Sequence, residues 1–193
     1  MYMSKVAEIR EKYMSAPRDF IEEIQTNVGL PIKNVQIVDD TEAFIKLIEG
    51  LNTYPFEEVL FTNPFVIFSL VENKKGFTLK VHNCLTFQLH DGSLIRISPT
   101  DDDKIELTRI ETSESGKGKG SELMKFLLNY IDSLLGYIPP IQAELTGAIG
   151  MNTTYKETPI SKQKLFFQKH GFKVTYSSKG FLKMERPESK KSN

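Results

Sequence analysis

The chain of 193 residues has a single cysteine, no excess of either charge and no long apolar run. Because Cys84 stands alone, no internal disulfide can form, and a reducing cytoplasm is the compartment that suits the chain. Its 25 basic residues match its 25 acidic ones, so the charge excess of a nucleic-acid-binding surface is missing. No run approaches the ~20 apolar residues of a membrane span, and the N-terminal residues are too charged for a secretory signal. We therefore expect a soluble cytoplasmic protein whose partner is neither a nucleic acid nor a membrane.

Histidine and cysteine are too sparse in this sequence to suggest a metal site. His82 and Cys84 form a His-x-Cys pair, and His90 follows a little further along. A structural zinc ion takes about four such ligands at suitable spacing, and the sequence offers no further cluster of them. Ordinary strand positions are the favoured interpretation of these three residues, and we expect no metal.

The first third of the sequence has helical spacing. Apolar residues recur at intervals of three and four between residues 4 and 27, and Pro17 is suited to begin a second helix there. Asp39, Asp40 and Thr41 then supply capping oxygens for a helix that Gly50 ends. The pattern predicts that residues 1–60 form a helical segment packed on the same domain, with a surface that could serve a homodimer.

Beyond Pro64 the apolar period changes from helical to two, which is typical of strands. Residues 121–135 and 161–170 return to helical spacing. The pattern predicts an α/β (α+β) core over residues 61–186, followed by a polar tail, residues 187–193, that we expect to be disordered. The predicted strands cover residues 65–71, 77–81, 85–90, 94–98, 104–111, 141–149, 172–176 and 181–184.

One predicted strand changes phase partway along its length. Ile105 and Leu107 alternate on one face, but the next apolar residue is Ile110, which has the opposite parity. A slip of one residue is what a β-bulge produces, and bulges are frequent beside functional sites. A strand buried on both faces would give the same pattern, so both interpretations stay open.

The stretch that follows is unusually rich in glycine. Residues 115–121 read Ser-Gly-Lys-Gly-Lys-Gly-Ser, between the phase-slipped strand and the helix of residues 121–135. Backbone N–H groups without side chains, at the start of a helix, favour an anion and most often a phosphate. The segment lacks the Gly-x-x-x-x-Gly-Lys-Ser/Thr spacing of a P-loop. It also lacks the Gly-x-Gly-x-x-Gly spacing of a dinucleotide fingerprint, and Asp132 falls inside the helix rather than at a following strand end.

The run from Ile110 to Met124 resembles the acyl-CoA loop of the GNAT superfamily of N-acetyltransferases, which places Arg/Gln-x-x-Gly-x-Gly/Ala between a bulged strand and a helix. A second signature of that superfamily, a short helix ending in Tyr-x-x-x-Gly-Phe, is similar to the run from Phe166 to Phe172. Spacing, order and element types agree over roughly residues 84–186. The resemblance implies a mixed, mostly antiparallel central sheet with helices on both faces, and acetyl-CoA as the cosubstrate.

The resemblance also implies where each part of the cosubstrate lies. The pyrophosphate of CoA would bind main-chain N–H groups of the loop, whose lysines would either neutralise its charge or simply be solvated. The pantetheine arm would pair with the bulged strand, in a V-shaped gap against the strand of residues 141–149. At the start of the loop, serine replaces the usual Arg or Gln. The implied positions are Ile110, Glu111 and Thr112 for pantetheine, and Ser115, Gly116, Lys117, Gly118, Lys119, Gly120 and Ser121 for the phosphates.

The implied reaction is direct attack of an amine, on a small molecule or a protein, on the thioester carbonyl of acetyl-CoA. A base would take the ammonium proton, often through water. The carboxylates expected to face the gap are candidates for that base, although each also fits a surface or structural role. They are Glu106, Glu111 and Glu144.

The usual proton donor to the leaving thiolate is missing from the second signature. The tyrosine of that motif aligns with Phe167, which has no proton to give. Tyr155, Tyr176 or a water molecule would then protonate the thiolate, or it would leave unaided. The alternative is a non-catalytic acyl-CoA-binding or regulatory protein with the same fold.

Overall fold

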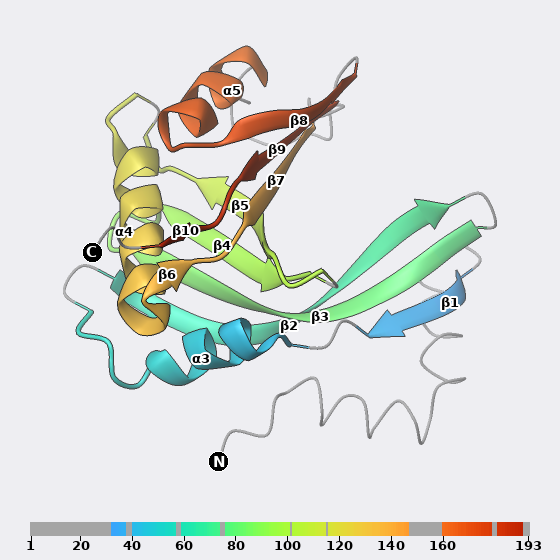
Figure 1. The fold of residues 1–193 in the computed structure, drawn as a ribbon, viewed down its shortest axis with the longest axis horizontal. Coiled ribbons are helices and arrows are strands. Elements are labelled where there is room, and N and C mark those ends of the chain that lie inside the picture. Colours follow the sequence, from blue (N-terminus) through green and yellow to red (C-terminus); the bar gives the residue numbers. More distant parts are fainter. Residues whose placement is uncertain are drawn as a thin grey trace.

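The computed structural model describes residues 32–37, 40–56, 59–73, 76–100, 102–114, 116–146, 160–178 and 181–190 (Figure 1). The helices within these ranges are α3 (Glu42–Gly50), α4 (Lys119–Leu135) and α5 (Ile160–Lys169). The strands are β1 (Ile32–Ile37), β2 (Val59–Asn73), β3 (Gly76–Leu89), β4 (Leu94–Pro99), β5 (Ile105–Glu111), β6 (Tyr137–Ile138), β7 (Ile141–Thr146), β8 (Lys173–Ser178), β9 (Phe181–Arg186) and β10 (Ser189–Lys190).

The main sheet has eight strands and is mixed, as the sequence predicts. Its strands run in the order β1-β3-β4-β5-β7-β9-β8, and β2 pairs with β3 beside this path. The pairings of β1 with β3 and of β5 with β7 are parallel. The other described pairings within it are antiparallel. The predicted α/β class with a mostly antiparallel sheet is therefore confirmed.

One hydrophobic core joins the described helices to a single face of this sheet. On α4, Leu123, Leu127, Tyr130 and Ile131 recur at helical spacing and are fully buried. They pack in one cluster with side chains of α3 and α5 and with alternate residues of the strands from β3 to β9. Gly136, in the left-handed conformation at φ 73°, ends the helix. This packing fixes the start of α4 relative to the end of β5.

The opposite face of the sheet is also buried near its centre. Cys84, Thr86 and Ser98 alternate with core residues along β3 and β4, and each is buried. The helices that the sequence predicts between residues 4 and 27 lie outside the described residues. A helix on this second face therefore stays a prediction.

Four segments depart from the predicted boundaries. β2 begins at Val59 and continues through Pro64, and β3 joins the two strands predicted over residues 77–81 and 85–90. Residues 32–37, which were expected within the helical segment, form strand β1 and pair in parallel with residues 77–81 of β3. Val35 and Ile37 are β-branched and alternate with polar residues, which favours a strand. Ser189 and Lys190, which were expected in a disordered tail, pair with β6 as strand β10.

No helix in the described ranges is long and apolar enough to span a membrane.

Candidate functional site

The predicted bulge is present in β5. Arg109 pairs with Arg96 and Leu107 with Ile97, so Thr108 is an extra residue without a partner position on β4. Its hydroxyl donates a hydrogen bond of 3.3 Å to the carbonyl of Arg96. The extra residue lets Leu107 and Ile110 both face the hydrophobic core. The phase slip in the sequence is therefore a bulge and not a strand buried on both faces.

Beyond the bulge, β5 and β7 diverge. They pair only over residues 105–107 of β5 and 141–143 of β7. From there β5 stays with β4 as far as Glu111, whereas β7 stays with β9 as far as Thr146 (Figure 1). We call residues 108–111 of β5 and 144–146 of β7 the splayed edges. Among the described residues, their backbone groups pair with a neighbouring strand on one side only, which is the arrangement that an extended ligand can complete.

The glycine-rich segment follows directly from the splayed edge of β5. Gly116 and Gly118 have φ angles of 84° and 80°, a conformation that favours glycine, and nothing lies within 4 Å of where their Cβ atoms would be. Gly118 is the N-cap of α4, and the first helical bond of α4 runs from the N–H of Glu122 to the carbonyl of Gly118 (3.0 Å). The N–H groups at the start of α4 thus precede the helical ladder, which is an arrangement that favours an anion.

The two lysines of the segment are paired with nearby glutamates. Lys117 contacts Glu114, and the Nζ of Lys119 lies 2.9 Å from Glu122 Oε2. All four side chains are at least one third exposed. Ion pairs of this kind contribute little to stability, so exchanging a glutamate for a phosphate would cost the fold little.

Gly120 brings α5 against the start of α4. A Cβ atom at Gly120 would lie 3.3 Å from Phe166 Cε2 and 3.6 Å from the methyl carbon of Thr112. The missing side chain therefore allows the ring of Phe166 to rest on the first turn of α4. The glycine loop, the end of β5 and α5 meet at this point.

The second signature ends α5 in a Schellman motif. The N–H of Phe172 bonds to the carbonyl of Phe167, and the N–H of Gly171 bonds to that of Gln168, both at 3.1 Å. Gly171 has the left-handed φ of 85° that this motif uses. The rings of Phe167 and Phe172 pack edge to face with centroids 5.1 Å apart, and Phe167 is 2% exposed. Phe167 is therefore a core residue that secures the end of α5.

We expect Phe167→Tyr to destabilise the protein without creating a proton donor. The added hydroxyl would be buried in an apolar cluster, which costs about 1–3 kcal/mol if the hydroxyl finds no partner. Thermal unfolding should give a lower midpoint, and thiol release from acetyl-CoA should not become faster. A variant of unchanged stability and higher activity would show that position 167 reaches the reacting atoms.

The three carboxylates named from the sequence lie on the sheet face opposite the core, but they are not equivalent. Glu106 lies beside Gln142, where the splayed edges begin, and is half-buried. Glu111 accepts a hydrogen bond of 2.8 Å from Arg109 Nε, and Glu144 lies 3.2 Å from Lys183 Nζ. Glu111 and Glu144 thus each contact a cation on the same face of the sheet.

Of the tyrosines named as proton donors, Tyr176 does not lie beside the splayed edges. Tyr176 is on β8, which β9 separates from β7, and its side chain is 56% exposed. Tyr155 and Ser115 lie outside the described residues. Among the residues that the structure does describe, no three His, Cys, Asp or Glu side chains gather as a metal site would require.

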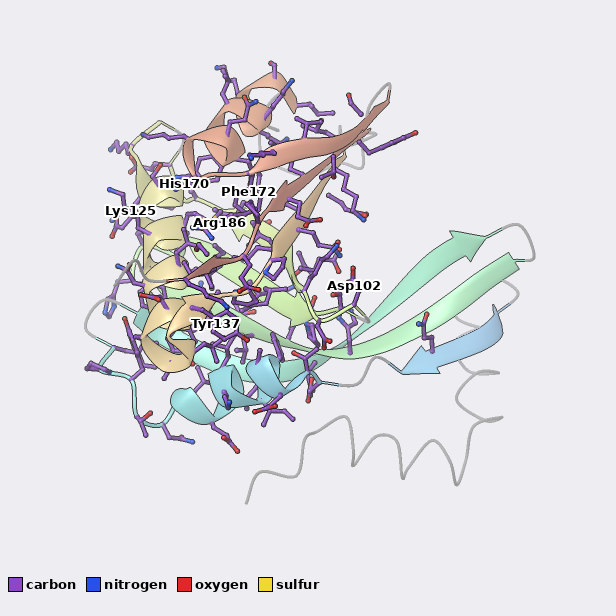
Figure 2. The ribbon with its side chains drawn as sticks, in the orientation of Figure 1. Asp102, Lys125, Tyr137, His170, Phe172 and Arg186 are labelled. Atoms are coloured by element: carbon purple, nitrogen blue, oxygen red, sulfur yellow. The ribbon has the colours of Figure 1, made fainter. Side chains whose placement is uncertain are left out.

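Sequence reasoning missed a histidine at this site. His170 Nε2 lies 3.2 Å from the hydroxyl of Ser121, and its ring centroid is 4.9 Å from that of Phe166. Burial lowers the pKa of His170, and the positive charges of Lys169 and Lys125 lower it further. Figure 2 shows His170 near the upper part of α4, with Lys125 on that helix. No spacing rule links residues 121 and 170, so only the packing of α5 on α4 reveals the pair.

Comparisons with known proteins give a consistent class of similar structures but no sequence match. No family model and no curated protein matches the chain. The solved structures to which it is similar are acetyltransferases of the GNAT family and related N-acetyltransferases.

One of them, a GNAT family acetyltransferase from Elizabethkingia anophelis with acetyl-CoA bound, has 12% identity and a TM-score of 0.39 over 55% of this chain and 76% of that one. The N-acetyltransferase PseH from Campylobacter jejuni has 18% identity and a TM-score of 0.38 over 56% and 69%. The ribosomal-protein-S18-alanine N-acetyltransferase from Escherichia coli has 10% identity and a TM-score of 0.40 over 58% and 72%. TM-scores below 0.5 decide neither family nor function, which have to come from the chain's own residues.

Proposed function

We propose that this protein binds acetyl-CoA and transfers its acetyl group to an amine of a small molecule or a protein. The observation that carries the proposal is the divergence of β5 from β7 at a one-residue bulge, directly before a glycine loop that opens a helix. An extended arm that ends in phosphates needs both features, in this order. Strand edges bind the arm through its amides, and the helix start binds the phosphates.

The amides of the pantetheine arm would pair with the backbone of β5 near Ile110, Glu111 and Thr112. The pyrophosphate would then lie on the N–H groups between Gly116 and Ser121, where two left-handed glycines leave open space. Lys117 and Lys119 would exchange their glutamate partners for phosphate oxygens. The thioester end of the arm would point toward the bulge, where the splayed edges meet.

In the proposed reaction the amine nitrogen attacks the thioester carbonyl carbon, and the carbon–sulfur bond breaks. A backbone N–H beside the bulge would hold the developing oxyanion. Glu106 and Glu144 flank the last β5–β7 pair, and Glu106 is the less exposed of the two, so we assign it the ammonium proton, taken directly or through water. Water would protonate the thiolate, because Phe167 is buried in the core.

A second candidate is a protein that binds acyl-CoA without turning it over. Two observations favour it. The position of the usual tyrosine is a core phenylalanine, and Glu111 and Glu144 are engaged by Arg109 and Lys183. Both candidates use the same loop and the same strand edges, so they differ only in turnover.

Thermal unfolding with and without acetyl-CoA tests the binding of acetyl-CoA, which both candidate functions require. A ligand at one hundred times its Kd stabilises by about 2.7 kcal/mol, which corresponds to a rise of roughly 5–10 °C for a chain of this size. The absence of any rise, together with no retention on immobilised CoA, would overturn both candidates.

Release of free thiol from acetyl-CoA, measured with a panel of amines, separates the two candidates. Amine-dependent release indicates an acetyltransferase, and Glu106→Gln should slow it while leaving acetyl-CoA affinity unchanged. Glu144→Gln is the matched control, because it removes a more exposed carboxylate from the same face of the neighbouring strand. Binding without release from any amine supports the non-catalytic candidate.

A further inference from the structure

We infer that His170 controls the hydrogen-bonding role of Ser121, and that it thereby adds a proton-dependent contact to the phosphate end of the acyl-CoA site. The inference rests on the proposed function, because it concerns the same loop. It assigns a positioning residue at a position that the second signature leaves unspecified.

The contact lies within the first turn of α4. Ser121 is the third residue of that helix, so its backbone N–H is among those that precede the helical ladder. Its hydroxyl lies 3.2 Å from His170 Nε2. A serine hydroxyl has one proton to donate and lone pairs to accept with, so the state of the imidazole decides what it offers to a ligand.

Two arrangements follow from the protonation of His170. When Nε2 carries no proton, Ser121 donates its only hydroxyl proton to the ring. The lone pairs of its oxygen then face the loop, and they repel an anion. When Nε2 carries a proton, it donates to Ser121 Oγ, and the hydroxyl proton is free to bond a phosphate oxygen. The imidazolium always has a proton on Nε2 and also brings a positive charge, so it always favours the anion.

The fold holds the ring of His170 in this position. His170 is the C-cap residue of α5 in the Schellman motif, between Phe167 and Gly171. One face of its ring packs on Phe166, which itself rests against the first turn of α4 at Gly120. The ring is therefore directed at Ser121 by two packed elements and not by a flexible loop.

The charges around His170 explain why a ligand would change its protonation. Lys125 on α4 and Lys169 on α5 oppose the imidazolium, and burial opposes it more strongly. Glu122 on α4 is paired with Lys119, and the Arg186 side chain of β9 reaches Gly171 beside the ring. An arriving phosphate would relieve the excess of positive charge and raise the pKa of His170. Because the complex then favours the protonated ring, affinity should increase as the pH falls through that pKa.

Calorimetric titration of the full chain with dephospho-CoA, between pH 5.5 and pH 8, tests the inference. Dephospho-CoA is the probe because it lacks the 3′-phosphate, whose own second ionisation near pH 6 would obscure the result. For the wild type we expect affinity about five- to tenfold higher at the acid end, as a charge-assisted hydrogen bond is roughly twice as strong as a neutral one. Pantetheine, which has no phosphate, should show no such change.

Two variants of His170 identify the group responsible. His170→Gln presents an amide N–H at every pH, so its affinity should remain nearly constant across the range. His170→Phe removes both the donor and the acceptor and leaves the Ser121 proton free at every pH, so its affinity should also lose the dependence on pH. His90→Gln is the matched control, because it removes an exposed histidine on the turn after β3 and should keep the wild-type slope.

The outcomes separate this inference from the proposed function. If dephospho-CoA and acetyl-CoA bind at no pH, the proposed function fails. If they bind and His170→Gln keeps the wild-type slope, the site stands and the role of His170 is refuted. If the His170 variants lose the slope and His90→Gln keeps it, His170 is the titrating group.

Discussion

Gly118→Asp is expected to abolish measurable acetyl-CoA binding while leaving the protein folded. The φ of 80° at Gly118 costs an L-residue about 1–2 kcal/mol, and Asp is among the residues that tolerate it best. Nothing lies within 4 Å of the new Cβ atom, so no packing is disturbed. A carboxylate within about 4 Å of a phosphate costs roughly 1–4 kcal/mol, depending on exposure, and CoA brings two phosphates to this loop. Affinity should fall by about a hundredfold or more.

Two matched variants separate charge from strain in this test. Gly136→Asp places the same residue at a left-handed glycine, also in open space, at the other end of α4. It should keep wild-type affinity and lose more stability than Gly118→Asp, because an acidic side chain is favourable at a helix N-cap and unfavourable at a helix C-terminus. Gly118→Asn has nearly the same shape without the charge, so its affinity should lie between those of Gly118→Asp and the wild type. Titration calorimetry with acetyl-CoA measures all three, and wild-type affinity in Gly118→Asp would refute the phosphate position.

The features near the glycine loop were predictable because they depend on local rules. A strand alternates strictly, so the parity change between Leu107 and Ile110 left a one-residue bulge as one of only two explanations. A left-handed backbone conformation favours glycine, and Gly116 and Gly118 both adopt it. Their spacing in the sequence therefore predicted a loop whose backbone is open to a ligand. Both features can be read within a window of about ten residues.

The features that local rules could not give depend on packing between distant segments. Strand β1 forms because β3 is long enough to pair with it as well as with β4. The residues near Val35 favour a strand, but nothing in them identifies β3 as its partner. The partners Ser121 and His170 meet only because Gly120 admits Phe166. Motif alignment put Phe167 at the position of the usual tyrosine, but only the packed structure shows that it is a core residue at the end of α5.

Deleting Thr108 is expected to abolish acetyl-CoA binding with little loss of stability. Thr108 is the extra residue of the bulge, so its removal leaves Leu107 and Arg109 opposite the same β4 partners and keeps Ile110 on the core face. A strand without its bulge loses the bend and added twist that turn β5 away from β7, so the two strands should continue to pair beyond residues 107 and 143.

The paired edges would then leave no room for an extended ligand between them. We expect the unfolding free energy to change by about 1 kcal/mol or less, because one side-chain hydrogen bond is lost and regular pairing is gained. Thr108→Ala is the matched control, since it loses the same hydrogen bond but keeps the residue count, and it should bind acetyl-CoA like the wild type. Chemical denaturation and calorimetry measure the two quantities separately. If the deletion variant is stable and binds acetyl-CoA with wild-type affinity, the bulge does not open the site, and the ligand must lie elsewhere than between β5 and β7.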